Sequence, residues 1–157
     1  MEEQLEYMQQ AVELSAIAIH QNEGGPFGCV IVKEGKVVGK GNNKVFKNND
    51  PTAHAEIVAI RDACANLKAN TLEGCELYTS CEPCPMCMAA IYWARIRKVY
   101  YANTAEDAAR IGFDDKAIHF ELMKPIAERS LPMENIGRDM ANKVFAEWHD
   151  KEDKELY

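Results

Sequence analysis

The spacing of apolar residues near the start of the chain predicts a helix that ends at a break. Leu5, Met8, Val12 and Ile19 recur at steps of three, four and seven residues, so they fall on one face of a helix. A Gly-Gly-Pro sequence follows at residues 24–26 and does not continue a helix. We therefore expect an amphipathic helix that buries one face and ends before residue 24.

Short apolar runs between turn residues predict strands. Residues 27–33 form such a run, and the Glu-Gly pair at residues 34–35 makes a tight turn before residues 36–40 return as a second strand. The sheet should therefore begin with an antiparallel hairpin. The same rules predict helices at 53–67, 85–94, 104–110 and 139–148 and strands at 75–79, 97–101 and 118–122.

The order of these elements indicates an α/β fold. A hairpin followed by helices that alternate with strands favours a mixed sheet of roughly five strands between two helical layers, a three-layer α/β/α arrangement. The later crossovers should be right-handed. The pattern shows no internal repeat and no long linker, so we interpret residues 1–157 as a single domain.

Composition and charge narrow the classes of function. The 157 residues are 47% hydrophobic and can bury a substantial core. A formal net charge of −7 argues against a surface built for nucleic-acid phosphates. Neither a membrane span nor a signal peptide is recognisable in the sequence. We therefore expect a cytoplasmic protein whose six cysteines serve as metal ligands or buried thiols.

Four residues carry the candidate chemistry. His54 offers an imidazole, and Cys84 and Cys87 offer two thiolates at a spacing that a tetrahedral zinc accepts. Three protein ligands leave the fourth position for water, which is the composition of a catalytic zinc site. Glu56 follows the histidine by two residues, and a carboxylate placed there can act on that water as a general base and then as an acid.

The cysteine spacing by itself leaves the ligand pair open. Cys81 and Cys84 are also separated by two residues, so they offer the same spacing as Cys84 and Cys87. A site that combined all three cysteines with His54 would be closed and structural. Such a site would have no use for Glu56, which favours the open arrangement.

Two helix starts are expected to bring these groups together. His54 and Glu56 lie roughly 200° apart around a helix, so they can serve one site only from its first turn. Thr52 is a suitable N-cap for that helix. Pro85 suits the first turn of the next helix, which puts Cys84 at the cap, where the helix dipole favours a thiolate. We place the site at these N-termini, beside the carboxyl ends of strands.

Together these residues resemble the cytidine deaminase-like superfamily, whose signature is H-x-E followed by P-C-x-x-C. The resemblance and the proline before Cys84 favour Cys84 and Cys87 as the ligand pair. The segments at 112–115 and 90–95 are similar to the guanine deaminase branch, and those at 49–56 and 78–87 also look like bacterial tRNA adenosine deaminases. The resemblance implies one zinc per chain, a purine pocket and a homodimer.

The resemblance also implies roles for residues around the zinc. Asn43 would contact the bound base through its amide, Phe27 and Trp93 would form apolar walls, and a C-terminal segment ending at Tyr157 would close over the site. Asp115 is the expected specificity residue, because guanine presents N1–H and 2-amino donors along one edge and a carboxylate only accepts. Each of these residues also has a plain interpretation as a turn residue, a core residue, a surface acid or a loose chain end.

We therefore hypothesise a zinc aminohydrolase that converts guanine to xanthine and ammonia. One alternative is deamination of another base, such as adenosine in tRNA, cytosine or a nucleoside. The other is a zinc-stabilised binding module without turnover.

Overall fold

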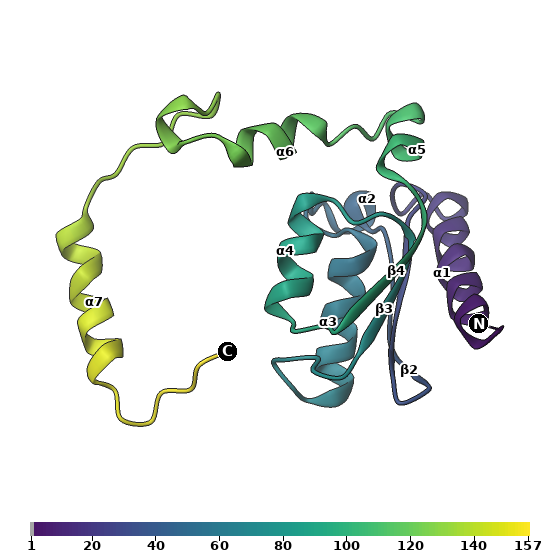
Figure 1. Cartoon of the computed structure of the whole chain (residues 1–157), viewed down its shortest axis with the longest axis horizontal. Helices are drawn as coiled ribbons and strands as arrows, with labels where there is room; N and C mark the ends of the chain where they lie inside the picture. The colour runs from purple at the N-terminus through teal and green to yellow at the C-terminus, as the bar shows by residue number, and fades with distance from the viewer. Residues whose placement is uncertain (1) are drawn as a thin grey trace. The chain divides into compact units, whose positions relative to one another are not determined.

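The computed structural model describes residues 2–157, which form two compact units, and Met1 lies outside the described residues. The first unit ends at Asp115 and contains the sheet, and the second covers Lys116–Tyr157 and is helical (Figure 1). Among the helices of residues 2–157, none is both long enough and apolar enough to cross a membrane.

The first unit follows the predicted order of elements. Its first helix covers the predicted apolar stripe, and its first two strands form the predicted hairpin. A short helix, α2, has no counterpart in the prediction. The elements are α1 (Glu2–His20), β1 (Gly28–Lys33), β2 (Lys36–Asn42), α2 (Val45–Asn48), α3 (Ala55–Leu67), β3 (Glu76–Cys81), α4 (Pro85–Trp93), β4 (Lys98–Asn103) and α5 (Ala105–Arg110).

The strands form a mixed sheet in the order β2-β1-β3-β4. β1 pairs antiparallel with both β2 and β3, whereas β3 and β4 run parallel and are joined through α4. Within residues 2–157 the sheet has four strands, one fewer than the roughly five predicted. The mixed sheet itself is confirmed.

The predicted strand at 118–122 is wrong, because these residues lie inside a helix, α6 (Lys116–Met123). Ile118, Phe120 and Leu122 alternate with polar residues, as they would in a strand. An apolar run this short does not distinguish a strand from a helix by its period. The alanine, leucine, lysine and methionine around it are good helix formers, and they decide the outcome.

Helices cover both faces of the sheet, so the three-layer α/β/α arrangement is confirmed. α1 packs on one face, and α3 and α4 pack on the other (Figure 1). In the central strand β1, Cys29 and Ile31 belong to the core on the α3 side, and Val30 and Val32 belong to the core on the α1 side. A strand buried on both faces needs a continuous apolar run, which is the pattern of this segment.

The end of β2 and the start of α3 touch through their backbones. A β-carbon added to Gly41 would lie 2.3 Å from the carbonyl oxygen of Ala55 and 2.5 Å from the backbone nitrogen of Ala59. Only glycine allows an approach this close. The contact seats the first turn of α3, which follows His54, directly beside the end of β2.

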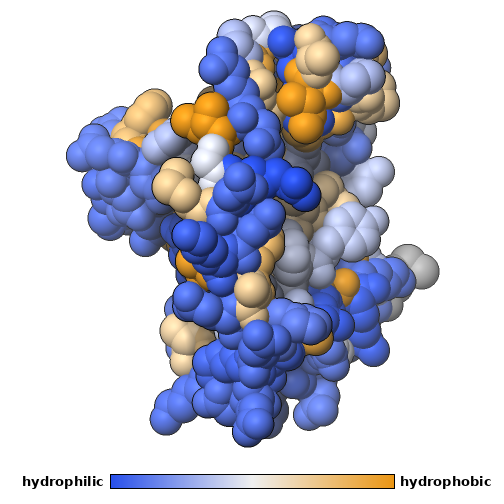
Figure 2. All heavy atoms as spheres, turned by 90° about the vertical axis from the view of Figure 1, so that its left-hand side faces the viewer, coloured by the Kyte–Doolittle hydropathy of each residue, from blue (hydrophilic) through white to orange (hydrophobic). Residues whose placement is uncertain are grey.

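The second unit contains α6, a short 3-10 helix (Ile126–Glu128) and α7 (Arg138–Asp150). None of residues 116–157, all of which the structure describes, is buried. Large apolar side chains such as Ile136 and Phe145 are exposed, and apolar residues stand among hydrophilic ones on the molecular surface (Figure 2). The second unit therefore has no apolar core of its own.

Candidate metal centre and active site

His54 occupies the N-cap position of α3, immediately before the first turn of the helix. The predicted cap at Thr52 is wrong by two residues, because the helix begins at Ala55. The backbone nitrogen and hydroxyl of Thr52 instead donate to Oδ1 of Asp50 at 2.8 and 2.7 Å. Thr52 thus forms a turn with Asp50 ahead of the helix, and His54 follows this turn at the N-cap position.

Cys84 and Cys87 lie where the chain passes from β3 into α4. Cys84 is the N-cap of α4, Pro85 is the first residue of the helix, and Cys87 follows within the first turn, as predicted. Cys87 is buried and Cys84 is half-buried. The starts of two helices therefore present one imidazole and two thiols to the same point.

The three donor atoms have the separations that a tetrahedral zinc requires. The Sγ atoms of Cys84 and Cys87 each lie 3.5 Å from Nδ1 of His54, and all three donors lie within 4.8 Å of one another. Zinc bonds of about 2.3 Å to sulfur and about 2.0 Å to nitrogen at a tetrahedral angle separate those two atoms by about 3.5 Å. The three residues therefore fit a zinc ion and form a candidate zinc site.

The protonation of the thiols also suits metal binding. The pKa of Cys84 is lowered to about 4, chiefly by its interaction with the neighbouring thiol of Cys87 and also by its interaction with His54. The pKa of Cys87 is raised by the same interaction with Cys84 and by burial. One thiolate is thus already favoured, and a bound metal ion would favour the second.

Glu56 is buried in the first turn of α3, against the ligands. Its Oε2 accepts from Sγ of Cys87 at 3.4 Å, and its Oε1 accepts from the hydroxyl of Thr79 at 3.3 Å. Burial raises the pKa of this carboxyl above its usual value. A carboxyl with a raised pKa, held beside the ligand set, is placed to exchange protons with a water molecule there.

Two of the predicted substrate residues are linked to each other and to the metal-binding turn. Asn43 follows the end of β2 and is buried, and its backbone nitrogen donates to the carbonyl oxygen of Phe27 at 2.9 Å. The next residue, Lys44, donates through its backbone nitrogen to Ala53, the residue before His54, at 2.9 Å. The backbone around Asn43 therefore borders the turn that holds the zinc ligand.

Phe27 and Asp115 stay predicted substrate residues, and their surroundings are now defined. The ring of Phe27 meets the ring of Phe113 edge-to-face, with centroids 5.0 Å apart. This contact joins the start of β1 to the loop after α5, which carries Asp115 in a half-buried position. The predicted apolar wall and the predicted specificity loop thus contact each other.

Trp93 and Tyr157, the other two predicted substrate residues, are both exposed. Trp93 is the last residue of α4, about 13 Å along the helix from Cys84 at its other end, and its side chain is 65% exposed. Tyr157 is the last residue of the second unit and is 68% exposed. Their roles in substrate binding stay predictions.

Sequence reasoning missed two polar residues in this region. Thr79 lies in β3 and supports Glu56, and Glu23 lies in the turn after α1, where it is buried and bonded to Asn42 and Lys47. Both residue types are common in loops and strand ends, so no periodicity distinguishes them. The Gly-Gly-Pro sequence after Glu23 was the available signal, because it indicates a tightly packed turn.

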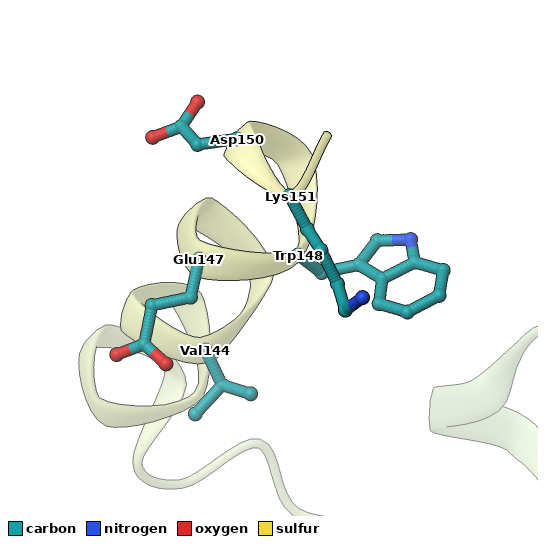
Figure 3. Close-up of a pocket in the computed structure, with 5 residues that line it drawn as sticks. All are labelled: Val144, Glu147, Trp148, Asp150 and Lys151. Atoms are coloured by element: carbon teal, nitrogen blue, oxygen red, sulfur yellow. The ribbon is translucent and has the colours of Figure 1, made fainter. Parts of the chain in front are cut away.

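A hollow on the surface of α7 has none of the candidate zinc ligands in its lining. Residues of this helix and the residue after it line the hollow, and their side chains are drawn in Figure 3. The lining residues are Val144, Glu147, Trp148, Asp150 and Lys151. With no His or Cys in this lining, the hollow does not resemble the metal site.

Comparison with protein families identifies the first unit. Residues 1–103 match the family described as the cytidine and deoxycytidylate deaminase zinc-binding region. The matched stretch contains His54, Glu56, Cys84 and Cys87.

Comparison with individual proteins extends the likeness to the second unit. A guanine deaminase of Bacillus subtilis is 47% identical over 151 residues, or 96% of this chain and 97% of that protein. The X-ray structure of guanine deaminase from Bacillus subtilis matches with a TM-score of 0.92 over 96% of each chain. A guanine deaminase structure from Nitrosomonas europaea matches with a TM-score of 0.66 at 29% identity, over 87% of this chain and 70% of that one. A tRNA-specific adenosine deaminase of Aquifex aeolicus is 51% identical over 77 residues, which are 49% of this chain and 51% of that protein.

Proposed function

This chain belongs to the family of zinc-dependent deaminases defined by the cytidine and deoxycytidylate deaminase zinc-binding region, and we propose that it deaminates guanine to xanthine and ammonia. The observation that carries the proposal is the extent of the likeness. The guanine deaminase of Bacillus subtilis matches 96% of this chain, including residues beyond Asp115. The tRNA-specific adenosine deaminase of Aquifex aeolicus matches only 49% of it.

The proposed reaction assigns the proton transfers to Glu56. Zinc held by His54, Cys84 and Cys87 lowers the pKa of a water molecule towards 7 when it is bound. Glu56 accepts the proton that the attacking water loses and passes it to N3 of guanine as the oxygen adds to C2. Glu56 then takes the proton of the new hydroxyl and gives it to the departing amine as the C2–N bond breaks. Guanine and water thus become xanthine and ammonia.

Recognition of guanine is proposed to rest on one protein group that accepts hydrogen bonds from the base and another that donates to it. An ionised Asp115 accepts from N1–H and the 2-amino group, and the amide of Asn43 donates to an acceptor on the base. Phe27 covers one side of the ring. The half-buried position of Asp115 and the contact between Phe27 and Phe113 support this arrangement.

We also propose that the two units act as one domain within a homodimer. Support comes from the exposed apolar side chains of residues 116–157, which have no core of their own, and from Tyr92 and Trp93 at the end of α4, which are 76% and 65% exposed. Residues with so much apolar surface are typical of contacts between chains.

The six cysteines carry free thiols, which supports a reducing, cytoplasmic setting.

Ammonia release from a panel of bases tests the proposed substrate. The zinc-loaded protein is incubated separately with guanine, adenine, cytosine, cytidine and tRNA, and kcat/KM is measured for each. We expect the highest value for guanine. A preference for tRNA that weakens steeply with salt would identify the tRNA enzyme instead. Zinc binding without ammonia from any of these compounds would identify a binding module.

A further inference from the structure

Glu23 is a buried carboxylate that the proposed reaction does not use. It lies in the turn between α1 and β1 and is only 5% exposed. Carboxylates are rarely buried unless they are paired, so the partners of Glu23 indicate what the burial achieves.

The partners of Glu23 come from two segments that flank Asn43. Its Oε2 accepts from Nδ2 of Asn42, at the end of β2, at 2.6 Å, and its Oε1 accepts from Nζ of Lys47 in α2. Its carbonyl oxygen also accepts from the backbone nitrogens of Phe46 and Lys47, at 2.9 and 3.1 Å. One residue therefore fastens the α1–β1 turn to the end of β2 and to α2.

Asn43 lies between the two segments that Glu23 holds. The same Nδ2 of Asn42 that donates to Glu23 also reaches the carbonyl oxygen of Asn43, at 3.4 Å. The side chain of Asn43 is oriented as well, because its Oδ1 accepts from the backbone nitrogen of Val45, the first residue of α2, at 3.1 Å. With the oxygen committed to Val45, the amide presents its NH₂ group on the other side, as a donor.

The α-carbon of Gly24 packs closely against the side-chain amide of Asn43. A β-carbon at Gly24 would lie 2.0 Å from Oδ1 and 2.8 Å from Cγ of Asn43. The φ of Gly24 is not positive, so its backbone conformation is open to other residues. Glycine is required at this position by the side chain of Asn43 and not by the turn.

We propose that Glu23 and Gly24 are positioning residues that set the direction of the Asn43 amide, and so determine selection of a base that carries an acceptor opposite its NH₂ group. This inference rests on the proposed function, in which Asn43 contacts the base. A donor held in place before binding loses little conformational freedom on binding. It also stays unpaired when a base without the acceptor enters, which is how a hydrogen-bonding site rejects an analogue.

The test is a pair of double-mutant cycles that combine changes at Glu23 and at Gly24 with Asn43→Ala. Glu23→Gln keeps the shape of the side chain but removes its charge, and Gly24→Ala adds the carbon that meets the amide. Each change should lower kcat/KM by about 10- to 100-fold, the effect expected of a displacement near 1 Å. In the Asn43→Ala background, where no amide is left to misplace, each change should cost less than about threefold. Losses of equal size in both backgrounds would show that the two residues only stabilise the turn, and would overturn the inference.

A matched control and a binding measurement complete the test. Glu76→Gln also removes a carboxylate that pairs with a cation, at 2.7 Å from Arg97, but at the opposite end of β3 from Cys81, so it should leave kcat/KM unchanged. If Asn43→Ala falls below the assay limit, the cycle is repeated on a Glu56→Gln background, with the Kd of the base as the readout.

The base used in the cycle is the one that wild type prefers, so the inference and the proposed function fail separately. A wild type that prefers another base overturns guanine as the substrate, while the cycle still decides the roles of Glu23 and Gly24. A wild type without turnover of any base overturns both.

Discussion

The thiol of Cys81 donates to the carbonyl oxygen of Thr104 at 3.6 Å. Among the described residues, the metal-binding group of His54, Cys84 and Cys87 does not include Cys81. The sequence offered two cysteine pairs with the same spacing, and the structure selects the second. Cys81 ends β3, whereas Cys84 is the N-cap of α4 and Cys87 lies in its first turn.

Removal of single cysteines tests this assignment. Cys87→Ala should lower the zinc content from about one per chain to near zero, because a thiolate ligand is lost. Cys81→Ala is the matched control and should keep its zinc. Elemental analysis of protein purified without added metal measures both. The reverse result would show that Cys81 and Cys84 form the pair.

Glu56→Gln separates proton transfer from zinc binding. The variant should keep zinc and fold but lower kcat by about 10²–10⁴-fold or more, because one carboxyl group acts at two steps. Asp62→Asn, on the same helix, is the control, since its carboxylate accepts from the backbone nitrogen of Lys40, at 2.9 Å. Ammonia release measures turnover. A Glu56→Gln enzyme within about threefold of wild type would remove this residue from the mechanism.

Asp115→Asn tests the selection of guanine. An amide places an NH₂ group where N1–H must donate, so kcat/KM for guanine should fall by more than 10²-fold, within the roughly 10⁴–10⁵-fold limit known for lost hydrogen bonds. Asp114→Asn should do less, because neighbouring side chains in a loop diverge. Zinc content and Tm should stay unchanged in both variants. An Asp115→Asn enzyme that handles guanine like wild type would refute the proposed recognition.

Removal of the last three residues tests closure by the C-terminal segment. The chain ends in two exposed apolar residues, Leu156 and Tyr157, after a charged run. A protein that stops at Lys154 should lose activity while its Tm stays within a few degrees of wild type. Tyr157→Phe, which keeps the ring, is the control. Unchanged kcat and KM in the truncated protein would show that the tail has no role in catalysis. Light scattering on each protein measures its molar mass and so tests the proposed dimer.

The pairing of Glu23 with Lys47 predicts a specific dependence of stability on acid. The pKa of Glu23 is lowered, first because Lys47 donates to it and then because Asn42 does, against the opposing effect of burial. Its contribution is therefore complete above the ordinary pKa of about 4.3 and is lost as the pH falls through the lower pKa of the folded protein. The difference in Tm between wild type and Glu23→Gln should be constant above about pH 5.5 and shrink below about pH 4. A difference that grows in acid would contradict this pairing.

The sequence predicted the parts of the fold that have a clear apolar period. β1 is an example, because a strand buried on both faces is apolar at almost every position. The segment at 118–122 was mistaken for a strand because its alternation fits either element, and helix propensity decided it. The helix cap was placed at Thr52 because its hydroxyl suits a cap, whereas Asp50 engages that hydroxyl.

The site was predictable where a residue's chemistry is rare and not where it is common. Histidine and cysteine at ligand spacing identified the metal site, and Glu56 followed from its distance to His54. Glu23 and Thr79 act through contacts with residues far away in the sequence, so no local pattern identifies them. Trp93 lies at the end of α4 opposite the candidate ligands, and its place beside the base stays a prediction.

The backbone contact at Gly41 limits how far the metal-binding helix α3 can move relative to β2. Where two elements are separated by side chains, rotamer changes let one shift against the other. Here a glycine α-carbon lies against the peptide groups of Ala55 and Ala59, so no side chain stands between strand and helix that could repack. The backbone at the start of α3, which follows His54, is then held directly against the strand, so metal binding needs little movement of this support. The same feature leaves no tolerance for enlargement, since the smallest added group at Gly41 would displace the whole helix and the metal ligand with it.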